Sequence, residues 1–125
     1  MTQKHERGAA AVELAIILPI LLMLLFGIIE FGRWYNASIT VTHAARESVR
    51  KLALRDTVDN AKLAGTEAAA SLAPDVPTFG PITECKSGIT DAKVTMNFSF
   101  TFDIPFIPSI TSGDISKTAT MLCGG

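Results

Sequence analysis

The sequence predicts an α+β fold in which one long N-terminal helix carries a second helix and a small antiparallel β-sheet. Three patterns predict it: an apolar run over residues 9–29, helical spacing of apolar residues over 36–54 and 58–72, and strict alternation over 93–104. The chain has 125 residues, and those outside the apolar run suffice for one small domain but not for two.

The apolar run is long enough to cross a membrane. Residues 9–29 contain a single charge, Glu13, and a helix of this length measures roughly 31 Å at ~1.5 Å per residue. That length matches a hydrocarbon core of about 30 Å. A cleavable general signal peptide is disfavoured, because the run is longer than the apolar region of such signals and no Ala-x-Ala site follows it. The sequence therefore predicts a retained membrane anchor.

Flanking charges predict the orientation of this anchor. Lys4 and Arg7 precede the run, whereas Arg33 follows it and is paired in sequence with Glu30. The small excess of positive charge before the run favours a cytoplasmic N-terminus. The expected organisation is a polar leader without regular structure, a transmembrane helix and an extracytoplasmic domain, which correspond to residues 1–8, 9–31 and 32–125.

Helical structure is expected to continue beyond the membrane. Residues 36–54 contain neither Pro nor Gly, and several of their small and apolar side chains lie close to one face. A second helix is expected to start at Asp56–Asp59, where a side chain can cap free N–H groups, and to end before Pro74.

The strands are predicted in the C-terminal part of the chain. Over residues 93–104 six apolar residues alternate with six polar ones, which is typical of a strand with one buried face. The apolar face of residues 36–54 is the available cover for this strand. A weaker strand is expected over 115–123. Because two strands alone rarely form a stable sheet, a third is expected either within 78–89 or from a neighbouring subunit.

The connection between these two strands, residues 105–110, is unusually apolar. The sequence supports two interpretations of this connection equally. In the first, the connection folds back onto the core of the domain. In the second, Phe106, Ile107 and Ile110 form an exposed docking patch.

The two cysteines, Cys85 and Cys123, both lie beyond the predicted anchor. An even pair in a translocated segment predicts a disulfide in an oxidising compartment. Closing a loop of about 38 residues would stabilise the domain by ~4 kcal/mol. Two cysteines without nearby His or carboxylate ligands make an incomplete ligand set, so no metal site is expected.

Composition and motifs give no support to several classes of function. A net charge of −1 gives no reason to expect nucleic acid as a partner. The sequence has no Gly-rich phosphate loop and no His-x-x-x-His motif, and His43 has no neighbour that suggests a catalytic dyad. The protein is therefore not expected to be an enzyme or to need a cofactor.

Glu13 is the one charged residue of the apolar run, and its presence there needs a physical reason. A carboxylate at the bilayer centre costs ~2.5–3.5 kcal/mol, and less near an edge. One interpretation places it near the interface, stabilised by the N-terminal end of the helix dipole. The other notes that a cut after Gly8 would give Ala9 a free amine four positions before Glu13, on the same helix face. Glu13 would then pair with its own amine or with that of a neighbouring subunit.

The segment Arg7-Gly8-Ala9-Ala10-Ala11-Val12-Glu13-Leu14-Ala15, which combines a basic leader, a cut site and an acidic residue in an apolar helix, resembles the class III signal of type IV pilins and pseudopilins. Within that group it is similar to the start of TadE-like proteins, pilin-like components of the tight-adherence (Flp pilus) secretion system. The similarity continues through Leu18-Pro19, Phe31-Gly32-Arg33 and Ala44-Ala45-Arg46-Glu47. A weaker likeness covers the alternating strand and the C-terminus.

The resemblance implies a type IV pilin-like fold and a processing site. A prepilin peptidase would cut between Gly8 and Ala9, and Glu13 would be the acidic residue used in processing or assembly. Leu14 stands where major Flp pilins have Tyr, and Ala9 where other type IV pilins have Phe. Both differences favour a minor pilin or pseudopilin over the major fibre subunit.

The function that follows is pilus biogenesis, surface adhesion and biofilm formation in a tight-adherence (Flp, type IVc) system. Its implied partners are other pilin subunits, the inner-membrane assembly platform, the prepilin peptidase and membrane lipid. The implied location is the inner membrane, with possible incorporation into a surface pilus. The alternative function is that of a single-pass receptor or scaffold with a small extracytoplasmic binding domain.

Overall fold

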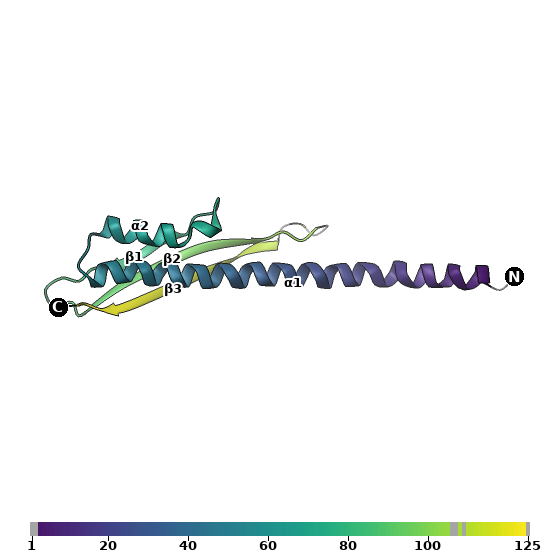
Figure 1. The fold of residues 1–125 in the computed structure, drawn as a ribbon, viewed down its shortest axis with the longest axis horizontal. Coiled ribbons are helices and arrows are strands. Elements are labelled where there is room, and N and C mark those ends of the chain that lie inside the picture. Colours follow the sequence, from purple (N-terminus) through teal and green to yellow (C-terminus); the bar gives the residue numbers. More distant parts are fainter. Residues whose placement is uncertain (1–2, 106–107, 109, 125) are drawn as a thin grey trace.

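The structure is a computed structural model that describes residues 3–105, 108 and 110–124, with the side chains of residues 3–7 and 110–112 outside the description. A long helix runs the length of the molecule, and the other elements lie along its C-terminal half (Figure 1). The predicted α+β class is confirmed. The elements are α1 (Gln3–Ala53), α2 (Val58–Ala68), a short 3₁₀ helix η1 (Ala70–Leu72), β1 (Thr78–Thr83), β2 (Asp91–Phe102) and β3 (Ile110–Leu122).

Helix α1 is continuous over 51 residues and includes Pro19. It starts at Gln3, so the prediction that the leader lacks regular structure is wrong from that residue onward. The physical reason is that nothing between Gln3 and Ala9 stops a helix. No Pro occurs there, and Gly8 costs only ~1 kcal/mol in a helix interior, which the long apolar helix after it outweighs.

The sheet has three antiparallel strands in the order β1-β2-β3. The long strand β2 lies in the centre, and its register with β3 places Val94 opposite Ala119 and Phe98 opposite Ile115. Strand β1 supplies the third strand, so the sheet is completed within the chain and the first of the two alternatives is confirmed. The outer face is polar, and the hydroxyls of Thr95 and Thr118 lie 2.9 Å apart across it in a hydrogen bond.

The core lies between the inner face of the sheet and one stripe of α1. The apolar residues of β2 are buried as their alternation predicted, and the residues of α1 that cover them recur every three or four positions. This confirms the predicted cover. The buried side chains include Ala37, Val41, Ala44, Ala45, Ser48, Val49 and Leu52 of α1, and Val94, Met96, Phe98, Phe100 and Ile115 of the sheet. Because four of the seven helix residues are Ala or Ser, the sheet can approach the α1 backbone closely.

Helix α2 packs against α1 at a point where neither helix carries a large side chain. A Cβ added to Gly65 would lie 2.1 Å from Ser48 Oγ and 3.1 Å from the ring of Phe79. The helix begins with Thr57, whose hydroxyl accepts a hydrogen bond from the backbone N–H of Asn60 at 3.2 Å. The carboxylate of Asp56 accepts from Asn60 Nδ2 at 2.7 Å and from Thr57 N at 2.8 Å. Both hydrogen bonds fix the turn that reverses the chain.

Candidate functional site

The N-terminal half of α1 is an exposed apolar rod. Among the residues that the structure describes, α1 is the one helix long and apolar enough to cross a membrane, and none of its most apolar 18-residue window is buried. Its large side chains are exposed on all sides, as at the consecutive residues Ile16, Ile17 and Leu18, which are 65%, 50% and 48% exposed. A helix with apolar side chains on every face needs lipid or another protein to cover the faces that its own chain leaves exposed.

The predicted processing residues lie at the far N-terminal end of this rod (Figure 1). Gly8, Ala9 and Glu13 are all exposed, and a Cβ at Gly8 would meet nothing within 4 Å. Ala9 and Glu13 are four positions apart and therefore share one face of α1. Within the described side chains Glu13 takes part in no ion pair. The structure thus places these residues together, open to another protein and away from the sheet.

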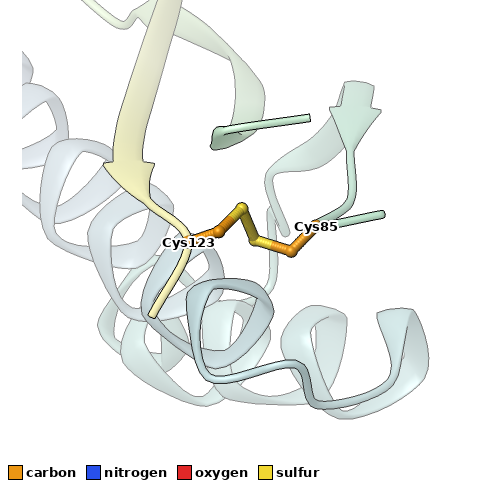
Figure 2. The surroundings of a disulfide bond; sticks show 2 residues. All are labelled: Cys85 and Cys123. Atoms are coloured by element: carbon orange, nitrogen blue, oxygen red, sulfur yellow. A yellow bond between two sulfur atoms is a disulfide. The ribbon is translucent and has the colours of Figure 1, made fainter. Parts of the chain in front are cut away.

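The two cysteines lie at the opposite end of the molecule. Cys85 and Cys123 form a disulfide with Cα atoms 5.7 Å apart (Figure 2). The bridge ties the end of β3 to the connection between β1 and β2. Next to it, the backbone N–H of Gly124 donates to the carbonyl of Ala53 at 3.0 Å. The end of α1 and the end of the sheet are therefore fastened to one another.

A buried carboxylate lies where the exposed half of α1 meets the sheet. Glu30 is only 6% exposed, and its Oε1 accepts from Arg33 Nη1 at 2.6 Å. Its Oε2 is buried and has no hydrogen-bond partner among the described residues. The guanidinium of Arg33 in turn lies 5.5 Å from the centre of the Phe100 ring. This small network fastens the end of the anchor to β2.

Sequence reasoning saw the Glu30–Arg33 pair but missed the burial of Glu30. A signal was present, because Glu30 stands seven positions before Ala37 and fourteen before Ala44, on the stripe that the sheet covers. A charge in register with a buried stripe predicts a paired, buried charge.

The segment that follows β2 reaches back along the exposed half of α1. Ile104 and Pro105 line an apolar groove of about 520 Å³ together with six residues of the helix: Ala15, Leu18, Pro19, Leu22, Met23 and Phe26. A separate cavity of about 280 Å³ lies nearer the sheet, and Asp103, Arg33 and Asn36 are among the residues that line it. The hairpin therefore contacts α1 on both sides of residue 31, the expected end of the anchor.

The predicted docking patch remains a prediction. Phe106 and Ile107 lie outside the described residues. Ile110 begins β3 opposite Phe102, and its side chain is outside the description as well.

The described residues offer surfaces for association with lipid or with another protein. In the part of the chain that the structure describes, no three His, Cys, Asp or Glu residues lie close enough together to hold a metal ion. The features that stand out are an apolar rod, an exposed carboxylate near one end and a compact α+β domain at the other. These define a protein with a pilin-like architecture and a helix suited to a membrane.

The TadE-like protein family model matches residues 8–50 of this chain. The matched segment starts at Gly8 and covers the exposed half of α1 and most of the half that lies under the sheet, so the resemblance seen in the sequence is confirmed there. The match covers residues 8–50 of the 125, and the rest of the chain lies outside it. No match was found among curated proteins or among solved structures.

Proposed function

We propose that this chain is a minor pilin or pseudopilin of a tight-adherence pilus, anchored by α1 in the inner membrane with its sheet domain on the extracytoplasmic side. The observation that carries the proposal is the family match over residues 8–50. It coincides with a helix whose N-terminal half is covered, among the described residues, only where Ile104 and Pro105 approach it. In this role the protein helps to build a pilus that serves adhesion and biofilm formation.

Processing is the first step of the proposed function. A prepilin peptidase cuts the exposed Gly8–Ala9 bond, and Ala9 gains a charged amine next to an apolar helix. An isolated charge there is costly, and so is the carboxylate of Glu13. Pairing the amine of one subunit with Glu13 of the next removes both costs at once. It also fixes the height of neighbouring helices relative to each other.

Packing supplies the rest of the association. Leu, Ile and Met side chains surround the exposed half of α1, and neighbouring subunits cover them with their own helices. Because helix–helix contacts in lipid gain little from the hydrophobic effect, the ion pair sets the register and the side chains set the fit.

The test is to express the full chain with and without the prepilin peptidase of a tight-adherence system and to determine the N-terminus by mass spectrometry. The mature protein should begin at Ala9 only when the peptidase is present. A chain that still begins at Met1 under both conditions would favour the membrane-anchored receptor or scaffold.

The role of Glu13 is tested separately. Glu13→Gln should leave membrane insertion intact and reduce processing or co-purification with other pilins by at least tenfold, the equivalent of about 1.4 kcal/mol. Glu47→Gln, on the same helix beyond the apolar segment, is the matched control and should have no effect. Equal behaviour of the two variants would contradict the role assigned to Glu13.

A further inference from the structure

The segment that follows β2 and the exposed half of α1 change from polar to apolar at the same height. On the helix, Glu30 and Arg33 are the first charged residues after the apolar run. In the segment after β2, Asp103 is the last charged residue before the apolar connection. Asp103 and Arg33 line the same cavity, whereas the next residues, Ile104 and Pro105, line a groove with Phe26 and Met23. Two segments that are far apart in sequence therefore share one boundary.

A planar boundary of this kind is what a membrane surface imposes on every element that crosses it. An interface with a second protein copy has no need to place the two changes at one height. Helical rise puts Phe26 about 10 Å and Met23 about 15 Å below Arg33. The hairpin residues that line the groove with Phe26 and Met23 are then within the hydrocarbon rather than at its surface.

The local backbone suits such an environment. Groups that enter hydrocarbon must satisfy their N–H donors or lack them. Pro105 has no N–H, and neither does Pro108 further along the connection. Ile104 and Pro105 carry no polar side-chain atoms. The groove that they share with α1 is open along the helix and lined by apolar side chains over about 17 Å of its length.

We infer that the segment just after β2, at Ile104 and Pro105, dips into the membrane leaflet on the side of the sheet domain. The groove between it and α1 holds a lipid acyl chain. The domain is thus seated on the bilayer at two points, the anchor and the hairpin end, and it cannot swing freely about the anchor. This inference rests on the membrane anchoring in the proposed function but not on processing or pilus assembly.

The experiment uses depth-dependent fluorescence quenching of the full chain in vesicles of phosphatidylethanolamine and phosphatidylglycerol that contain acyl-chain-brominated lipid. Trp34 is the one tryptophan of the sequence, so Trp34→Phe gives a silent background. In that background Ile104→Trp reports on the hairpin end. Leu24→Trp reports on the anchor and Leu63→Trp on α2, and both native side chains are well exposed.

Brominated lipid should quench Ile104→Trp to at least half the extent seen for Leu24→Trp, and several-fold more than Leu63→Trp. Acrylamide in the water should quench it several-fold less than Leu63→Trp. The inference is overturned if Ile104→Trp behaves like Leu63→Trp while Leu24→Trp is quenched by lipid. If Leu24→Trp also escapes the lipid quencher, the anchoring itself is wrong and the proposed function falls with it.

Further measurements serve as controls for this result. Pro105→Trp is a second probe position, and it should give the same pattern if the hairpin end is in lipid. Resistance of the Cys85–Cys123 disulfide to a mild reductant shows that each variant has kept the fold of its domain. The protein is also diluted with more lipid. If the Trp probe then loses its protection from acrylamide, a second copy of the chain had covered the groove, and the inference is overturned.

Discussion

The two halves of α1 have the same geometry and opposite surroundings. From Glu30 to Ala53 one stripe of the helix is buried under the sheet and α2, and that stripe is rich in Ala and Ser. From Val12 to Ile29 large apolar side chains cover every face, and almost all of them are exposed. One helix thus has a C-terminal half whose small residues let the sheet approach closely, and an N-terminal half whose apolar side chains are left mostly exposed by the rest of the described chain.

The difference shows what each half depends on. A helix satisfies its own backbone hydrogen bonds, so both halves can exist in lipid or protein. Small residues in the C-terminal half let a sheet pack tightly, and a change of one methyl group is felt there. In the N-terminal half lipid adapts to any apolar shape. Stability of the domain should therefore respond to substitutions in one half and ignore equivalent substitutions in the other.

Removing the disulfide should have the largest effect on the sheet-covered half. Cys85→Ser together with Cys123→Ser opens a loop of 38 residues, and the domain should lose about 4 kcal/mol of unfolding free energy. Urea unfolding of the chain in detergent, followed by circular dichroism, measures this loss. Helicity of the anchor should remain at urea concentrations that unfold the sheet. A double variant as stable as the oxidised parent would show that the disulfide does not stabilise the domain.

Adding bulk to the buried stripe should have the next largest effect. Ala44 is fully buried, and Ala44→Leu should destabilise the domain by about 1–3 kcal/mol because the sheet must move away. The matched variant is Ala11→Leu, at an exposed position in the other half of the same helix, which should leave the urea midpoint unchanged. Equal losses for the two variants would refute the contrast between the halves.

A smaller effect is expected at the crossing of α1 and α2. Gly65→Ala brings a methyl group onto Ser48 Oγ, and the net loss should be about 1–2 kcal/mol after the gain in helix propensity. Ser48→Ala removes the clashing hydroxyl, which has no partner among the described residues, and should recover part of the loss in a double-mutant cycle.

The matched glycine is Gly27 in the exposed half, where an added Cβ meets nothing within 4 Å. Gly27→Ala should not destabilise the domain. If Gly65→Ala is equally harmless, the two helices are not as close as the structure places them.

The smallest effect is a pH dependence at the turn between α1 and α2. Hydrogen bonds from the Asn60 side chain and the Thr57 backbone hold the pKa of Asp56 below its ordinary value. Because the pKa is lowered by folding, the contribution is present at neutral pH and is lost as the pH falls below that ordinary value and through the lowered one. Asp56→Asn should reduce stability at neutral pH, and the gap to the parent should close in acid. A gap that is constant with pH would contradict this assignment.

Much of the fold was predictable, because its signals are local. The alternation over 93–104 needs no knowledge of a partner to indicate a strand with one buried face, and the stripe over 36–54 identified its cover. The disulfide followed from two cysteines beyond an apolar run. The family resemblance rested on contiguous residues from Arg7 to Ala15, so it too was visible in the sequence.

What the sequence did not reveal depends on contacts between distant segments. Strand β1 contains Gly80 and Pro81 and has no clean alternation, so only its pairing with β2 defines it. The burial of Glu30 requires the sheet to be in place. The approach of Ile104 to Phe26 joins residues 78 positions apart. The assignments of Gly8, Ala9 and Glu13 remain predictions that the two experiments on processing and assembly address.

The uncovered half of α1 has a consequence for how this protein can travel. Burying one large apolar side chain is worth about 1.5–3 kcal/mol, and more than a dozen of them lie bare between Val12 and Ile29. Release of a single molecule into water would thus be prohibitively uphill. If α1 anchors the protein in a bilayer as proposed, the protein can leave it only when each lipid contact is replaced by a contact with an equally apolar neighbouring protein.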